Sequence, residues 1–154
     1  AYIRRLAERL RALGVPVPPH LTQSNGGVLG VEAAARLPVR LVLSGPSTGV
    51  VGAQAIGRAA GFPDLLTFDM GGTSTDVALL QDGVAGMAPE ALVHGYPIKA
   101  PMLDIHTVGA GGGSVAFVDA GGLLKVGPRS AGADPGPACY GRGNAEATVT
   151  DANV

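Results

Sequence analysis

The sequence contains little of what would define several other classes of protein. Its 154 residues include a single cysteine, Cys139, no tryptophan and only 4% aromatic residues. One cysteine excludes an internal disulfide, which is typical of a reducing compartment. The sequence shows no apolar run long enough to span a bilayer and no signal peptide. We therefore expect a cytoplasmic protein that does not associate with a membrane.

Charged residues are also scarce, at 15%, whereas hydrophobic residues reach 46%. This balance excludes intrinsic disorder and predicts a folded domain with an aliphatic core. The net charge of −1 is divided unevenly: residues 1–60 carry seven arginines and two glutamates, and residues 61–154 carry four basic and ten acidic side chains. The acidic half holds the candidate site residues described below. Because nucleic-acid binding needs a basic face, we expect no nucleic-acid partner.

Glycine is abundant, with 25 residues, and eleven of these fall between Gly109 and Gly143. Glycine allows backbone conformations with positive φ and lets the backbone approach a ligand closely. The density therefore favours ligand loops, although a β-rich region with many tight turns is the alternative.

Hydrophobic periodicity and turn residues predict alternating helices and strands. We expect helices over 2–13, 32–36 and 48–60, with Ser44 and Ser47 capping the last, and strands over 20–23, 39–43, 65–68, 75–80, 102–107, 114–118 and 123–126. No regular element is expected over 127–145. A strand–helix unit beside a strand–turn–strand hairpin predicts an α/β domain with a mixed sheet.

The strongest motif runs from Leu66 to Leu79 and suits phosphate binding. An apolar strand delivers Asp69 at its end, and the following glycines expose backbone N–H groups. Asp76 returns to the same end of the hairpin, and the turn between the two carboxylates consists of Gly71, Gly72, Thr73, Ser74 and Thr75. Backbone N–H groups and hydroxyls form an anion cradle. Two carboxylates beside bound phosphate suit Mg²⁺. The alternative is a hairpin turn with a polar rim.

This motif resembles a phosphate-binding hairpin of the actin-like ATPases. The resemblance implies that Gly71, Gly72 and Thr73 contact phosphate, with Ser74 and Thr75 beside them. It also implies that ATP and Mg²⁺ are the cofactors, and that Asp69 and Asp76 act as catalytic residues near the metal and the attacking group.

Three further stretches narrow the resemblance to the hydantoinase A/oxoprolinase family. They are 23–27, 43–46 and 101–114, the last continued by 127–141. The resemblance implies an incomplete α/β domain of the actin-like ATPase (ribonuclease H-like) fold with a mixed sheet. That partial domain spans 1–154, with its phosphate-binding hairpin at 66–80 and Gly-rich loops at 108–143. We interpret the chain as an internal fragment, since it does not begin with Met.

The same resemblance implies an ATP-dependent hydrolase that opens cyclic amides of the hydantoin or 5-oxoproline type by phosphorylating the amide oxygen. It also implies a second subunit or domain of the hydantoinase B type as partner. Two alternatives stay open: a nucleotide-handling subunit of an acetone- or acetophenone-type carboxylase, and a non-catalytic actin-like module that binds nucleotide.

Other candidate site residues lie further along the chain. Asp104 and His106 share a predicted strand at spacing i, i+2, which would place them on one face as a metal or acid–base pair. Cys139 is a candidate soft ligand for a second divalent ion, Zn²⁺ or Mn²⁺, beside them. A tethered histidine and a buried thiol are the alternatives. Together with the family match, the run Gly111, Gly112 and Gly113 indicates a nucleotide contact, and a sharp corner in the sheet is its alternative.

Overall fold

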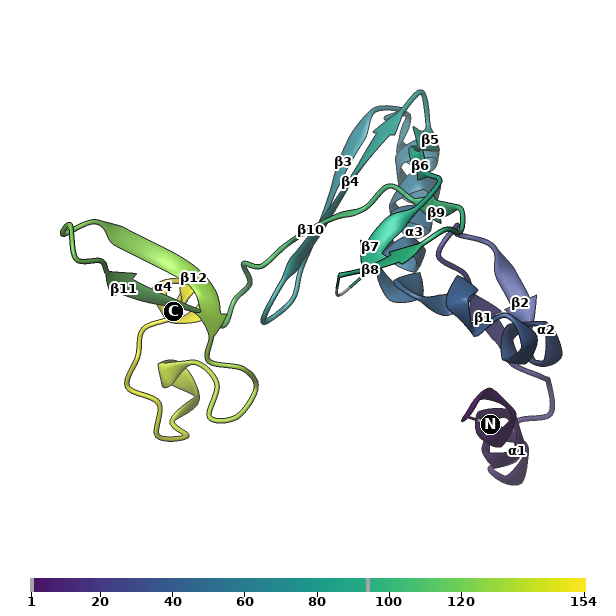
Figure 1. The fold of residues 1–154 in the computed structure, drawn as a ribbon, viewed down its shortest axis with the longest axis horizontal. Coiled ribbons are helices and arrows are strands. Elements are labelled where there is room, and N and C mark those ends of the chain that lie inside the picture. The colour runs from purple at the N-terminus through teal and green to yellow at the C-terminus, as the bar shows by residue number, and fades with distance from the viewer. Residues whose placement is uncertain (1, 94) are drawn as a thin grey trace. The chain divides into compact units, whose positions relative to one another are not determined.

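The computed structural model describes residues 2–93 and 95–154, and these form two compact units. The first unit contains residues up to 67 together with 78–105, and the second contains 68–77 together with 106–154. Strands β3 (Leu65–Met70) and β4 (Thr75–Gln81) contribute residues to both units (Figure 1).

The remaining elements of the first unit are helices, a short 3-10 helix and small antiparallel strand pairs. They are α1 (Tyr2–Ala12), β1 (His20–Thr22), β2 (Val28–Gly30), α2 (Val31–Arg36), η1 (Pro38–Leu41), α3 (Ser44–Ala60), β5 (Val84–Ala85), β6 (Met87–Ala88), β7 (Ala91–Val93), β8 (Tyr96–Ile98) and β9 (Met102–Leu103). Strand β1 pairs with β2, β4 with β5, β6 with β9, and β7 with β8, all antiparallel.

The core of the first unit forms where α3 meets β4. Val50 of α3 clusters with Ala78, Leu80 and Ala85, and Leu80 is completely buried. Further side chains pack against this cluster from β3, β9 and the segment after β9, namely Leu65, Leu103 and Ile105. The core therefore holds the C-terminal half of β4, around Ala78 and Leu80.

The expected strand over 39–43 is wrong, because the chain forms the 3-10 helix η1 there. Pro38 stands at the first helical position, where its fixed φ suits a helical turn. The Arg40 carbonyl accepts hydrogen bonds from the Ser24 backbone and hydroxyl, both at 2.8 Å, instead of from a neighbouring strand. An apolar run alone cannot distinguish these two outcomes.

Helix α3 begins at Ser44, four residues earlier than expected. Leu43 precedes it in a left-handed conformation, with φ of 60°, and no side chain caps the helix. The expectation that Ser44 and Ser47 cap it is therefore wrong. Ser47 instead lies buried inside the first turn, where its hydroxyl donates to the carbonyl oxygens of Leu43 and Ser24, each at 2.9 Å.

The second unit combines the tip of the β3–β4 hairpin with four later elements. They are β10 (His106–Val108), β11 (Ser114–Val118), β12 (Leu124–Ser130) and α4 (Val149–Ala152), with a 3-10 turn, η2 (Ala138–Tyr140), between the last two. Strand β10 pairs antiparallel with β4, and β11 pairs antiparallel with β12. Since β12 runs to Ser130 and η2 follows it, the expectation of no regular element over 127–145 is partly wrong.

The combination of helices and strands agrees with the expected α/β class. The pairings whose registers the described residues give are all antiparallel. Among the described residues, no helix is both long and apolar enough to cross a membrane.

Candidate phosphate-binding site

The turn between β3 and β4 carries backbone N–H groups that have no acceptor among the described residues. The Gly71 N–H donates to the Ser74 carbonyl at 2.9 Å and closes the turn. Gly72 and Thr73 are exposed at its tip. Within residues 2–93 and 95–154, no protein acceptor pairs with the N–H groups of Gly72, Thr73 or Ser74. Three neighbouring N–H groups without a protein partner are donors that phosphate oxygens can use, which makes the turn a candidate anion site.

Two carboxylates flank this turn. Counting outward from the Gly71–Ser74 hydrogen bond of an antiparallel hairpin, Asp69 on β3 stands opposite Asp76 on β4. Directly opposed side chains lie on the same face, with Cβ atoms about 4.5–5.5 Å apart. Asp69 is exposed and Asp76 is half-buried. A pair of oxygen ligands beside an anion site fits Mg²⁺, which binds one or two carboxylates together with phosphate and water.

The Gly109–Gly113 loop packs directly against this turn. The Gly112 N–H donates to the Gly71 carbonyl at 2.9 Å, and the Gly113 N–H donates to the Gly72 carbonyl at 2.7 Å. A Cβ added at Gly111 would lie 2.7 Å from the backbone of residues 71–73. Only glycine allows the two loops to approach so closely.

The N–H groups of this glycine run are used inside the protein. Besides the two bonds to the turn, Gly111 donates its N–H to the buried Ser114 hydroxyl at 2.8 Å. The structure thus gives Gly111, Gly112 and Gly113 the role of supporting the 71–74 turn. Direct contact with a nucleotide stays a prediction, and it would not use these donors.

Strand β10 supports Asp76 and Thr75 from the opposite side of β4. Thr107 stands opposite Asp76 in the ladder, and its hydroxyl donates to Asp76 Oδ1 at 2.6 Å. The Thr75 hydroxyl, which is buried, donates to the Ala110 carbonyl at 2.5 Å. Thr107 could not be identified from the sequence, where its only signal is a threonine in an ordinary strand pattern. The pairing of β10 with β4 is nonlocal.

Asp104 and His106, two of the predicted metal ligands, do not share a strand. The expected single strand over 102–107 is wrong, because β9 ends at Leu103 and β10 begins at His106. The chain changes partner between them: Asp104 donates its N–H to Gly86, whereas His106 pairs with Val77. The i, i+2 argument for one shared face therefore does not apply.

Asp104 belongs to the first unit, and His106 and Cys139 belong to the second. No group of three or more His, Cys, Asp or Glu side chains suited to a metal ion occurs in the part of the chain that the structure describes. A second metal at these residues stays a prediction that the described geometry does not support.

Cys139 is exposed and lies against Asp151 in the N-terminal turn of α4. The Cys139 backbone N–H donates to Asp151 Oδ1 at 2.7 Å. Hydrogen bonding to the Asp151 carboxylate, followed by desolvation and charge repulsion, raises the pKa of the Cys139 thiol. Hydrogen bonding to Cys139 is likewise the main cause that holds the pKa of Asp151 well below its usual range. Because the thiolate is the form that binds metals, this setting disfavours Cys139 as a metal ligand.

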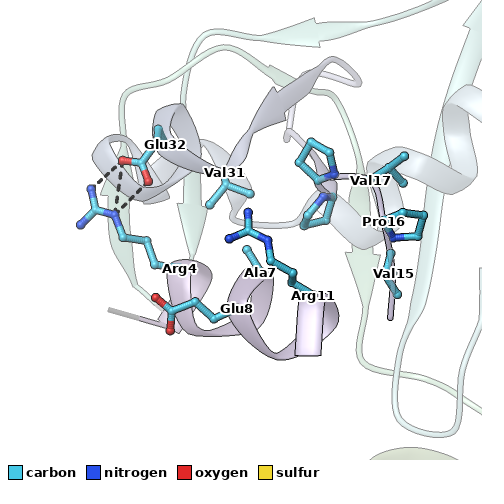
Figure 2. A pocket seen from close by; sticks show the side chains of 11 residues that line it. Arg4, Ala7, Glu8, Arg11, Val15, Pro16, Val17, Val31 and Glu32 are labelled. Carbon is cyan, nitrogen blue, oxygen red and sulfur yellow. Dashed lines mark hydrogen bonds and ion pairs between the residues drawn. The ribbon is translucent and has the colours of Figure 1, made fainter. Parts of the chain in front are cut away.

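A separate groove of about 360 Å³ lies in the first unit between α1, α2 and the proline-rich segment after α1 (Figure 2). Arg4 pairs there with Glu32 at 2.8 Å, and both side chains are more than half exposed. None of the predicted site residues lines this groove. Exposed ion pairs contribute little to stability, so the arginines are consistent with a solvated helix face.

Comparison with known proteins identifies the family. A model of the hydantoinase/oxoprolinase family matches residues 1–154, so the chain belongs to this family. It is 41% identical to caprolactamase subunit alpha of Pseudomonas jessenii over 153 residues, which cover 99% of this chain and 22% of that protein. It is 45% identical over 134 residues to 5-oxoprolinase of Saccharomyces cerevisiae, covering 86% of this chain and 10% of that protein.

Solved structures share the fold. The ATP-dependent caprolactamase from Pseudomonas jessenii superposes with a TM-score of 0.79 at 39% identity, covering 99% of this chain and 22% of that chain. Nucleotide-free acetone carboxylase superposes with a TM-score of 0.78 at 29% identity, covering 97% of this chain and 21% of that chain. The predicted fold class is confirmed. The chain spans about a fifth of the length of each of these structures.

Proposed function

We propose that the protein to which this chain belongs is an ATP-dependent hydrolase that opens cyclic amides. The observation that carries the proposal is the 71–74 turn between Asp69 and Asp76, where no described residue accepts from the N–H groups of Gly72, Thr73 and Ser74. Such a turn offers an anion site and carboxylate ligands within a few residues. Membership of the hydantoinase/oxoprolinase family supports the cyclic-amide substrate.

In this proposal the backbone of the turn binds phosphate, and the two flanking aspartates bind the metal. The N–H groups of Gly72, Thr73 and Ser74 would donate to phosphate oxygens of ATP. Asp69 and Asp76 would hold Mg²⁺, which would neutralise charge on the transferred phosphoryl group. Phosphoryl transfer depends mainly on such positioning and electrostatic stabilisation.

The reaction needs ATP because an amide carbonyl is a poor electrophile. The amide oxygen attacks the γ-phosphorus, and ADP leaves. Water then adds to the activated carbon, the nitrogen takes up a proton, and the ring C–N bond breaks to leave an acyl phosphate. A second water hydrolyses that acyl phosphate to carboxylate and inorganic phosphate. The net reaction consumes one ATP and two waters for each ring opened.

A second candidate function is a nucleotide-handling subunit of an ATP-dependent carboxylase. The structural likeness to acetone carboxylase favours it, since the same fragment superposes on both enzymes with nearly equal TM-scores. In either case we propose a partner subunit or domain of the hydantoinase B type. The name of the caprolactamase relative, a subunit alpha, supports such an assembly.

ATP hydrolysis by the full-length protein with its partner tests the proposal. Mg²⁺ and a panel of hydantoins, 5-oxoproline, lactams and ketones would be supplied. We expect a cyclic amide to stimulate ADP release, and Asp69→Asn to abolish that stimulation. Stimulation only by a ketone with bicarbonate would support the carboxylase instead. Tight ATP binding without turnover, unchanged in Asp69→Asn, would support a non-catalytic nucleotide-binding module.

A further inference from the structure

The carboxylate of Asp76 has one side-chain donor among the described residues, and that donor comes from a distant segment. Thr107 lies 31 residues later and directly opposite Asp76 in the β4–β10 ladder. Its hydroxyl donates to Asp76 Oδ1 at 2.6 Å. A carboxylate accepts about four hydrogen bonds. This single bond therefore fixes its orientation and leaves Oδ2 available.

Strand β10 holds Thr107 in a defined place. Val108 pairs with Thr75 on one side of it, and His106 pairs with Val77 on the other. The buried Thr75 hydroxyl adds a bond to the Ala110 carbonyl just beyond the strand. The backbone of Thr107 is thus fixed from both directions. Its β-branched side chain has few χ1 states, so its hydroxyl is preorganised toward Asp76.

Both side chains are accessible to a ligand, since Thr107 is exposed and Asp76 is half-buried. At such a position a hydrogen bond contributes little to folding, because water can replace it. Its effect is on orientation. An unrestrained aspartate next to a phosphate site samples several rotamers, and only some of them point an oxygen toward a bound metal or the attacking group.

We propose that Thr107 is a positioning residue for phosphoryl transfer, acting through Asp76. Its hydroxyl holds Oδ1, so that Oδ2 stays directed to the metal-bound nucleotide or to the attacking group. This assignment rests on the proposed function, because it takes ATP as the substrate and Asp76 as part of the reacting site.

The test measures ATP turnover by the full-length protein with its partner for two matched variants. Thr107→Val keeps the branched shape and removes the hydroxyl, whereas Thr107→Ser keeps the hydroxyl. We expect Thr107→Val to lower kcat by about 10- to 100-fold, the usual cost of losing a supporting hydrogen bond next to a metal ligand. KM for MgATP should change by less than about twofold, because the N–H donors of the turn are untouched. Thr107→Ser should recover most of kcat.

A double variant tests whether Thr107 acts through Asp76. In an Asp76→Asn background, Thr107→Val should have almost no further effect on kcat, because coupled residues are non-additive. An equal fold-loss in both backgrounds would overturn the assignment, and so would wild-type kcat in Thr107→Val. Equal losses in the Val and Ser variants with lowered Tm would indicate a purely structural role. Absence of ATP turnover in the unaltered protein is a different result, since it overturns the proposed function itself.

Discussion

Gly111 lies so close to Gly72 that a methyl group between them would have no room. A Cβ at Gly111 would stand 2.7 Å from the Gly72 carbonyl carbon, a distance that real Cβ atoms essentially never show. The obstacle is backbone on a tight turn, which cannot rotate away as a side chain would. The candidate phosphate-binding turn is therefore shaped by a second loop that packs against it.

Gly111→Ala should displace the 71–74 turn. We expect the free energy of unfolding to fall by about 1–3 kcal/mol, as for other overpacked sites, and ATP affinity to fall with it. Gly109→Ala is the matched control, because a Cβ there meets nothing within 4 Å. Calorimetric ATP titration and thermal unfolding of both full-length variants would measure the difference. Equal ATP affinity in the two variants would contradict the supporting role of the loop.

Ser47→Ala should destabilise the start of α3. Ser47 is 1% exposed, and its hydroxyl donates to the carbonyls of Ser24 and Leu43. In the variant the Ser24 carbonyl keeps its bond from the Leu103 N–H, and the Leu43 carbonyl keeps its bond from the Ser47 backbone N–H. The cost should therefore lie near the low end for buried hydrogen bonds, about 1 kcal/mol. Urea denaturation would measure it. Thr48→Ala removes an exposed hydroxyl from the next residue and should change stability by less than about 0.5 kcal/mol.

Asp151→Asn should destabilise the second unit in a pH-dependent way. Hydrogen bonding to the Cys139 side chain, and then to its backbone N–H, is the main cause that holds the pKa of the Asp151 carboxylate below the usual range, and bonds from the Thr148 hydroxyl and N–H add to it. The Ala138 N–H also donates to this carboxylate. A lowered folded-state pKa gives stability that is present above the unfolded value of about 4 and is lost as pH falls. The Tm gap between wild type and variant should be full at pH 7 and shrink toward pH 3. A gap independent of pH would contradict this. Asp134→Asn provides a control at an exposed aspartate.

The Cys139 thiol should react slowly with iodoacetamide near neutral pH. Its pKa is raised by the hydrogen bond to Asp151, so less thiolate is present than for an ordinary cysteine. The reaction should speed up at higher pH, and Asp151→Asn should shift the profile to lower pH. Peptide mapping by mass spectrometry would follow Cys139 itself, with the urea-unfolded protein as the reference. Faster alkylation in the folded state than in the unfolded state would refute the prediction.

The residues of the hairpin itself could be predicted from the sequence, whereas the distant residues that pack against the hairpin could not. The pairing of Asp69 with Asp76 follows from a short hairpin, in which sequence distance and spatial distance agree. The contacts made by Thr107 and Gly111 join segments about 30–40 residues apart, and no periodicity encodes such a register. The 3-10 helix at 38–41 was missed because an apolar run fits a strand equally well.

The wrong strand over 102–107 has a similar cause. Most of its residues suit a strand, with Asp104 the exception. Its two ends pair with different segments of the chain. The Leu103 N–H donates to the Ser24 carbonyl, whereas His106 stands opposite Val77 in the ladder with β4. Such a change of pairing segment depends on the tertiary structure, so the local residue types do not predict it.

The order in which these contacts become available has a consequence for synthesis of the protein. The turn at 71–74 leaves the ribosome before the residues that support it, because Gly112 must follow to bond to Gly71, and Thr150 must follow to bond to Gly112. Long-range contacts form only after the entropy of closing the intervening loops has been overcome. We therefore expect that, in a nascent chain ending before Thr150, the 71–74 turn does not yet hold its final conformation. Nucleotide would then bind only to chains in which this stretch is complete, so an ATP analogue could act as a probe of how far folding has progressed.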